Sequence, residues 1–241
     1  IKDLKKKGYK EVTLTGVNIA QYKNKKLKEK NKNLSDLLKL ILKQTKIERI
    51  RLGSLDPRLI TDELLELYAK NSERLLPHFH LSLQSGSNKI LKTMGRGYTT
   101  EKYFKIIKKA RKKNQLFSFT TDIIVGFPGE SQEDFFQTCE FVKKCEFTKV
   151  HIFPYSRRPG TPAATMLNQV QDSIKKERIK KLTKIVEEIA KKFAQKFIGI
   201  ERPVLFENKK NKYWEGFTPE YVRVMNKSKE NLQNKIKKIK I

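Results

Sequence analysis

Residues 117–130 read FSFTTDIIVGFPGE, a run that predicts a buried strand ending in a glycine-rich turn. Residues 117–125 are rich in β-branched and aromatic side chains and have no helical period, which is typical of a strand inside a parallel sheet. Gly126, Pro128 and Gly129 then interrupt any regular structure. Bare backbone is therefore expected at the carboxyl end of the strand, where α/β folds assemble their ligand sites.

A helix is predicted to begin directly after this turn. Ser131 and Asp134 have the spacing of a capping box, so the helix should run from about residue 132 to residue 145. The whole stretch is then one unit of strand, turn and helix. Its turn is either an ordinary βα connection or a contact for a cofactor, and the local sequence leaves both readings open.

Four more strands with the same organisation are predicted. Each ends in a polar or glycine-containing turn, and helices with apolar residues three and four apart lie between them. The strands are expected at 11–15, 47–53, 78–84 and 148–155, and the helices at 34–42, 61–71 and 100–114. This alternation predicts an α/β fold with a parallel sheet, right-handed crossovers and curvature toward a barrel. All the turns should then face one mouth.

The turns carry the candidate ligand-binding residues. Gly16 and Asn18 follow the first strand, and they either offer amides to a ligand or simply tolerate a positive φ angle. Ser54 follows the second strand, and Gln84 follows the third. Arg96 stands between two glycines, where it could bind a carboxylate or phosphate in a bidentate manner or belong to a solvated loop.

The histidines and cysteines do not predict a metal site. His78 and His80 share one face of the third predicted strand, but no third ligand stands near them in the sequence. Cys139 and Cys145 are six residues apart on a predicted helix, which suits neither a disulfide nor a CxxC metal clip. Both cysteines are expected to be reduced, structural thiols.

Composition limits the classes of protein to which the chain can belong. With 241 residues, it should form one large domain or one domain with an appendage. It has no apolar run of 18 residues and no resemblance to a signal peptide at residue 1, so a cytoplasmic protein without a membrane span is expected. The formal net charge of +28 favours nucleic acid as a partner, although an A/T-rich genome also encodes such an excess of lysine, asparagine and isoleucine.

The pattern changes after residue 170. A long amphipathic helix is predicted from residue 172, and short strands without helices follow it. We therefore expect a core at 1–170, a connecting helix at 171–199 and a small β domain at 200–241. Basic and aromatic residues alternate in the β domain, which suits RNA, although the aromatic rings could instead form its core. The candidate RNA contacts are Arg202, Lys209, Lys210, Lys212, Trp214, Arg223 and Lys227.

Six motifs, in order, give the chain a family resemblance. They are LTGVN at 14–18, RLGSLDP at 51–57, HLSLQSGS at 80–87, MGRGYT at 94–99, TDIIVGFPGE at 121–130 and HIFPYSRRPGTPA at 151–163. Over nearly its whole length the chain resembles the radical SAM methylthiotransferases, and its tail resembles their RNA-binding TRAM domain. The third and sixth motifs are most similar to the branch that modifies N6-threonylcarbamoyladenosine beside the tRNA anticodon. The isopentenyladenosine branch is the alternative within the family.

The resemblance implies a fold and a reaction. The fold is a partial (β/α)6 barrel, here without its first strand, followed by a TRAM-like β-barrel. The implied reaction begins when a [4Fe-4S] cluster cleaves S-adenosylmethionine to a deoxyadenosyl radical. The radical takes hydrogen from C2 of adenosine 37 in tRNA, and a second cluster delivers the methylthio group. Catalytic side chains, the sulfur donor, the reductant and the oligomeric state stay open.

The resemblance also implies positions for S-adenosylmethionine. Ile124 and Gly126 are expected against the adenine, where a side chain at the glycine would collide, and Arg96 is expected to meet a carboxylate or a substrate phosphate. The full set of implied cofactor residues is Gly16, Asn18, Ser54, Gln84, Arg96, Ile124, Gly126, Tyr155 and Ser156.

One part of the family pattern is missing. The family binds its clusters through a CxxxCxxC motif and three further cysteines, whereas this sequence contains only two cysteines. We expect that the sequence lacks the N-terminal part of a longer enzyme, and that the chain alone holds no cluster and is inactive. A non-catalytic RNA-binding module, or a degenerate paralogue, is the alternative from another class.

Overall fold

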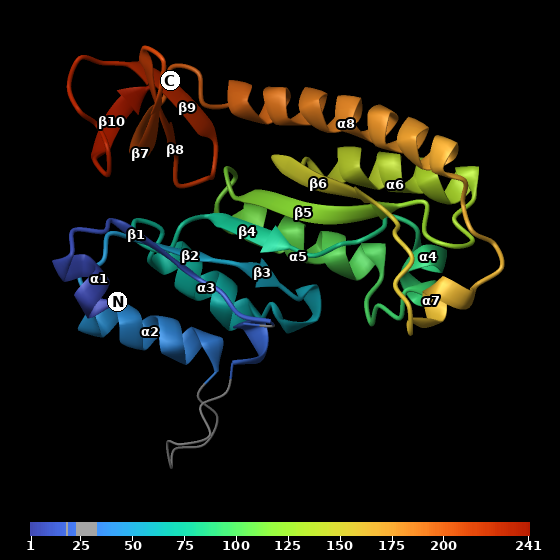
Figure 1. Cartoon of the computed structure of the whole chain (residues 1–241). Coiled ribbons are helices and arrows are strands. Elements are labelled where there is room, and N and C mark those ends of the chain that lie inside the picture. Colours follow the sequence, from blue (N-terminus) through green and yellow to red (C-terminus); the bar gives the residue numbers. More distant parts are fainter. Residues whose placement is uncertain (18, 23–32) are drawn as a thin grey trace. The chain divides into compact units, whose positions relative to one another are not determined.

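The computed structural model describes residues 1–17, 19–22 and 33–241, and it divides the chain into two units (Figure 1). The first unit contains Ile1–His80, Lys109–Ser118 and Ala194–Ile241. The second contains Leu81–Lys108 and Phe119–Phe193. Both ends of the chain therefore belong to the first unit. None of the described helices is both long and apolar enough to cross a membrane.

The first unit begins with a pair of parallel strands. β1 (Glu11–Leu14) pairs with β2 (Arg49–Leu52), and Ile50 of β2 forms a further parallel bridge with Leu75. β2 is buried along its whole length. A parallel strand buried on both faces agrees with the predicted fold class, although two of its four residues are arginines.

Helices and short turns accompany these strands. α2 (Leu34–Gln44) begins at Asn33, which forms a capping box with Asp36 and so satisfies the first free amide groups of the helix. Its buried residues recur three and four positions apart, as the sequence predicts. The other elements of this part are α1 (Lys2–Lys6), η1 (Ile19–Gln21), β3 (Ser54–Leu55), η2 (Pro57–Leu59) and α3 (Asp62–Lys70).

An aromatic cluster contributes to the core of the first unit. The rings of Tyr68 and Phe79 meet edge to face with their centroids 4.8 Å apart, and Phe117 lies 4.8 Å from Phe79. All three side chains are buried. Edge-to-face aromatic pairs add stabilisation beyond the burial of their surface. The cluster therefore helps to hold together the three segments of the chain that carry these rings.

The C-terminal strands form an antiparallel sheet in the order β10-β7-β8-β9. Its core consists of Val204, Phe206, Trp214, Val224 and Leu232. This sheet agrees with the predicted small β domain, and it includes the basic chain end, for which no strand was predicted. The strands are β7 (Glu201–Lys210), β8 (Tyr213–Phe217), β9 (Arg223–Lys227) and β10 (Ile236–Lys240).

Buried arginines attach this sheet to β2. Arg49 donates hydrogen bonds to the carbonyl oxygens of Pro203 (2.5 Å) and Phe217 (3.0 Å), and Arg51 pairs with Glu11 (2.8 Å). Burial lowers the pKa of Arg49 to about 10, while the carboxylate of Glu11 acts in the opposite direction. The C-terminal strands therefore share a compact unit with β1 and β2, although the sequence pattern separates them near residue 200.

The second unit is built around β5 (Ser118–Val125) and β6 (Lys149–Pro154), which pair in parallel. α6 (Gln132–Cys145) connects them and begins at the predicted capping box of Ser131 and Asp134. The predicted strand, glycine-rich turn and helix are thus confirmed. With the parallel pairing, they confirm the α/β class.

The remaining elements follow the predicted order. The third predicted strand ends earlier than expected, at Leu81. Gln84 has a φ angle of 75° and forms only an isolated parallel bridge with Ile123. α8 falls within the predicted connecting helix. These elements are β4 (His78–Leu81), α4 (Asn88–Thr93), α5 (Thr100–Lys113), α7 (Pro162–Thr165) and α8 (Asp172–Gln195).

Candidate functional site

A buried ion pair holds the turn after β5. The Gly126 N–H donates to Glu130 Oε2 (2.6 Å), and Nη1 of Arg178 in α8 donates to the same oxygen (2.6 Å). Both charged side chains are buried. Burial raises the pKa of Glu130, while the Gly126 amide and Arg178 oppose this rise. The ion pair therefore fixes the backbone at Gly126 from the side of α8.

Lys175 of α8 covers the same glycine. Gly126 has a φ angle of 71°, and a Cβ atom placed on it would meet the Cγ atom of Lys175. A side chain at this position would thus be both strained and obstructed. The family resemblance implies an adenine beside this glycine, which stays a prediction, and the structure places the aliphatic stem of Lys175 there.

Tyr155 lies beside this turn, at the end of β6. Its N–H donates to the carbonyl oxygen of Val125 (2.8 Å), and its ring centroid lies 5.3 Å from that of Phe127. Lys175 Nζ lies 5.7 Å from the centroid of the Tyr155 ring. The Tyr155 hydroxyl is buried and has no hydrogen-bond partner among the described residues. Buried polar groups are nearly always hydrogen-bonded, so this hydroxyl is available to a water molecule or a ligand.

Gln84 adjoins β5 on its other side. Its N–H donates to the Asp122 carbonyl (2.8 Å), and its own carbonyl accepts from the Ile124 N–H (2.9 Å). A positive φ angle is uncommon for a residue other than glycine, so the surrounding structure holds Gln84 in place. Four predicted cofactor residues are thus joined around the ends of β5 and β6. They are Gln84, Ile124, Gly126 and Tyr155.

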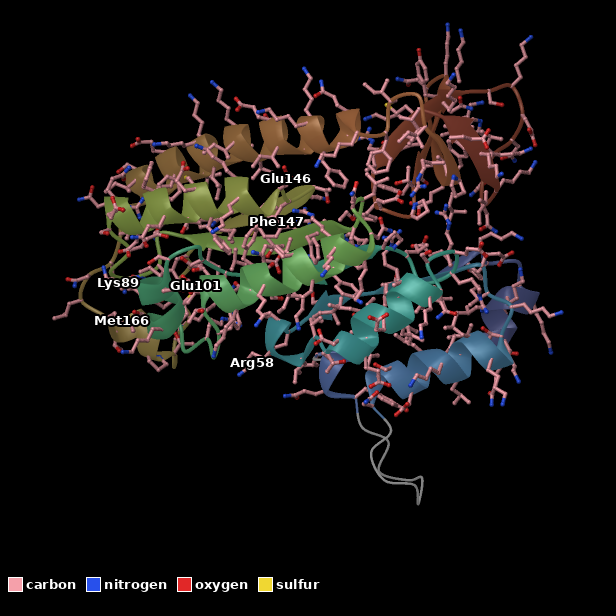
Figure 2. The ribbon with its side chains drawn as sticks, turned by 180° about the vertical axis from the view of Figure 1, so that it is seen from behind. Arg58, Lys89, Glu101, Glu146, Phe147 and Met166 are labelled. Carbon is pink, nitrogen blue, oxygen red and sulfur yellow. The ribbon has the colours of Figure 1, made fainter. Side chains whose placement is uncertain are left out.

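The segment after β4 is packed against α6. The Gly86 N–H donates to Thr138 Oγ1 (3.0 Å), and the Ser87 hydroxyl donates to Asp134 (2.8 Å). Lys89, labelled in Figure 2, pairs with the same carboxylate (2.7 Å). Burial acts to raise the pKa of Asp134, but Lys89 and neighbouring hydroxyl groups lower it to about 2. Asp134 is therefore ionised and structural, and it holds the loop that follows Gln84.

A cavity of about 710 Å³ opens next to Tyr155 and Ser156. This volume is within the usual range for small-molecule sites. Its remaining walls come from the end of β6, from the residue after Ser156, from the segment before α8 and from the first turns of that helix. They consist of Pro154, Arg157, Gln169, Val170, Gln171, Asp172, Lys175, Lys176 and Ile179.

The other predicted cofactor residues are not joined to this group. Gly16 and Ser54 belong to the first unit, after β1 and in β3. Arg96 lies in the turn after α4, where it is exposed and is not among the described residues that line the cavity. Asn18 lies outside the described residues. Their predicted roles stay predictions.

Sequence reasoning missed the contribution of α8. Lys175 and Arg178 support the turn at Gly126, yet the helix that carries them was predicted only as a connection. One signal was present, because Arg178 is the single arginine in a helix whose other basic residues are lysines. An arginine suits a buried pair with a carboxylate better than a lysine does.

Comparison with known proteins identifies the family of the chain. The profile described as "Radical SAM superfamily" matches residues 1–142. The chain belongs to the radical SAM superfamily. A solved structure titled "Coproporphyrinogen III oxidase (HemN) from Escherichia coli is a Radical SAM enzyme" has the same fold. It aligns with a TM-score of 0.53 and 20% identity over 65% of this chain and 36% of that one.

Three named relatives match this radical SAM chain over a larger share of its length. "Threonylcarbamoyladenosine tRNA methylthiotransferase MtaB" of Thermotoga maritima is 44% identical over 201 residues, 83% of this chain and 45% of the relative. The Bacillus subtilis protein of that name is 37% identical over 244 residues, which are 97% of this chain and 52% of that protein. "tRNA-2-methylthio-N(6)-dimethylallyladenosine synthase" of Orientia tsutsugamushi is 41% identical over 243 residues, which are 99% of this chain and 54% of that protein. The chain spans about half the length of these relatives.

Two of the predicted RNA contacts of this radical SAM chain, Trp214 and Arg202, are engaged within the C-terminal part of the chain. Trp214 is only 6% exposed and lies in the core of the C-terminal sheet, which favours the alternative that the aromatic rings form the core of the β domain. Tyr213 points to the opposite face and is 43% exposed. Successive side chains of a strand point to opposite faces of the sheet, and one face of this small sheet forms its core, so Trp214 is buried and Tyr213 is exposed. Arg202 pairs with the buried Glu220, so its charge is already matched.

The remaining basic residues gather at one end of the sheet. Tyr213 lies opposite Lys210 on β7 and Lys227 on β9. Lys209 Nζ lies 5.6 Å from the centroid of the Trp214 ring, and Lys212 belongs to the same turn between β7 and β8. Arg223 pairs with Glu215 at the other end of β8 and β9. We call Lys209, Lys210, Lys212, Tyr213 and Lys227 the hairpin cluster.

Proposed function

We propose that the chain is the cofactor- and RNA-binding part of a tRNA methylthiotransferase that acts on C2 of N6-threonylcarbamoyladenosine 37. The observation that carries the proposal is that the chain is 44% and 37% identical to two relatives named for that reaction. Its membership of the radical SAM superfamily supports the same conclusion. The relative named for the dimethylallyladenosine reaction is 41% identical, so that branch is the second candidate.

Residues at the ends of β5 and β6 fit S-adenosylmethionine. They supply one wall of a cavity of about 710 Å³ and a buried Tyr155 hydroxyl without a partner in the described chain. In this proposal Tyr155 and Ser156 form one wall, and Gln84 and Ile124 hold the neighbouring backbone. When bound, S-adenosylmethionine supplies the adenosyl group on which radical SAM chemistry depends. The side chains around the cavity would orient the cofactor and exclude water.

The residues present do not fit an iron–sulfur cluster. Such clusters are held by several cysteine thiolates, whereas the chain contains two cysteines, both buried in α6. Burial raises the pKa of the Cys139 thiol, which opposes formation of the ligating thiolate. No step is therefore assigned to a cluster bound by these residues.

Anaerobic reconstitution of the 241-residue chain with iron and sulfide should give no [4Fe-4S] absorption or electron paramagnetic resonance signal. It should also release no 5′-deoxyadenosine from S-adenosylmethionine. The Cys139→Ala, Cys145→Ala double variant is the matched control and should behave like the parent chain. A cluster signal that the double variant loses would contradict this reading of the thiols.

The hairpin cluster supports the RNA part of the proposal. Lys210 and Lys227 flank the exposed Tyr213 ring on its own face of the sheet, and Lys209 and Lys212 lie nearby at the same end. Phosphates can therefore take the positive charges while an unpaired base stacks on Tyr213. The net charge of +28 adds a general attraction for polyanions. tRNA is the partner that this surface and the names of the relatives both favour.

Deletion of the gene, followed by mass spectrometry of the tRNA nucleosides, tests the function. We expect loss of 2-methylthio-N6-threonylcarbamoyladenosine, with its precursor accumulating, and recovery when the gene is restored. Loss of the 2-methylthio-dimethylallyl nucleoside instead would favour the second branch. Unchanged levels of both would reject the enzyme and leave the RNA-binding module.

A further inference from the structure

The cavity beyond β6 has a basic side that contains none of the predicted cofactor residues. Tyr155, Ser156 and Arg157 line the cavity at the end of β6 and just after it, and Lys175 and Lys176 line it from the first turns of α8. We propose that this basic side binds the sugar–phosphate backbone of the RNA substrate. The inference rests on the proposed function and adds a second RNA contact, separate in sequence from the hairpin cluster.

Charge is the first argument. Three cations and one carboxylate line the cavity, and that carboxylate, Asp172, is already paired with Lys175 (3.0 Å). Arg157 and Lys176 are exposed, and in the described parts of the chain neither forms a hydrogen bond or ion pair through its side chain. The positive end of the α8 dipole lies on the same side and adds to the attraction for anions. Two free cations on a cavity wall suit phosphodiester groups.

Shape and hydrogen bonding are the second argument. The cavity volume of about 710 Å³ is large enough for a nucleotide. Gln169 and Gln171 add amide groups to its lining, and such groups can donate to phosphate or accept from a base. Tyr155 offers a ring and an unpartnered hydroxyl at the boundary with the predicted cofactor residues. A polar, cationic and partly aromatic lining is typical of sites for single-stranded RNA.

The test measures tRNA binding to the 241-residue chain as a function of salt. The Arg157→Ala, Lys176→Ala double variant should bind tRNA roughly tenfold more weakly at 0.1 M salt, and its salt slope should fall by about 2. The Arg157→Lys, Lys176→Arg variant should keep both values, because it preserves the charges. Thermal unfolding of the variants should match the parent chain, since both side chains are exposed.

The matched control removes two exposed lysines from other surfaces. Lys105 of α5 and Lys192 of α8 lie outside the residues that line the cavity, and Lys105→Ala, Lys192→Ala should leave the salt slope nearly unchanged. Equal losses in both double variants would overturn the proposal in favour of general charge attraction. So would an absence of tRNA binding by the parent chain.

A further arm separates the basic side from the cofactor wall. S-adenosylmethionine binding, measured by calorimetry with the ligand alone, should be the same in the parent chain and in Arg157→Ala, Lys176→Ala. If S-adenosylmethionine binding falls and tRNA binding does not, these residues belong to the cofactor site and the inference is wrong. Failure of the proposed reaction is seen separately, in the tRNA nucleosides of the deletion strain.

Discussion

Arg178→Ala should lower the free energy of unfolding by about 3–5 kcal/mol, because it leaves the Glu130 carboxylate buried without its partner. Both side chains of this pair are buried, and the Glu130 carboxylate also fixes the amide of Gly126. Chemical denaturation followed by circular dichroism gives the size of the loss. Lys180→Ala removes an exposed cation from the same helix and should stay within about 0.5 kcal/mol of the parent.

The loss from Arg178→Ala should depend on pH. Burial raises the folded-state pKa of Glu130, so the folded state holds this proton more tightly than the unfolded state does. Stability then falls as pH rises through the interval between the unfolded pKa, about 4.3, and the folded pKa. Arg178 acts to lower the folded pKa, so its removal widens this interval. The part of the stability loss that depends on the Glu130 charge should be complete at pH values above the folded-state pKa of Glu130. It should be absent at pH values below the unfolded-state pKa.

A double variant checks that the buried charge is the cause. Glu130→Gln combined with Arg178→Met removes both charges and should recover most of the stability that Arg178→Ala loses. A loss from Arg178→Ala that stays the same from pH 4 to pH 8, with no recovery in the double variant, would assign the effect to packing instead.

Gly86→Ala should lower the free energy of unfolding by about 1–3 kcal/mol, because the added methyl group has no space. A Cβ atom at Gly86 would lie 2.6 Å from the Cα atom of Thr138 and 2.9 Å from the Cβ atom of Phe141. Both neighbours belong to α6, so the loop or the helix must move. Movement of the loop would also shift Gln84, and hydrogen exchange of the α6 amides should become faster.

Gly16→Ala is the matched control for this substitution. A Cβ atom there would find its nearest neighbours at 3.9–4.0 Å, on Ile19, which is ordinary contact. The change in stability should therefore stay within about 0.5 kcal/mol. Similar losses at Gly16 and Gly86 would show that backbone freedom, and not the packing of Gly86 on α6, controls the result.

Local sequence signals predicted the elements that depend on near neighbours. The β-branched run before Gly126 and the capping box of Ser131 and Asp134 predicted β5, its turn and α6, and all three are present. The structure joins Gln84 and Ile124 by a backbone hydrogen bond, while their role at a cofactor stays a prediction. The end of the third strand at Leu81 was missed, and so was the positive φ angle of Gln84, which nothing in its local sequence indicates.

Taken alone, the sequence determined the α/β class, the order of the elements and the basic character of the chain, since these depend on short-range periodicity, caps and composition. Only the tertiary structure decided that Trp214 is buried while Tyr213 is exposed, that Arg49 joins the C-terminal sheet to β2, and that Arg178 fixes the turn at Gly126. Arg49 and Arg178 act on residues far away in the sequence, and Trp214 is buried by a core that several strands share. Pairings of this kind are set by how the elements pack, because each buried charge or ring must find its partner in space.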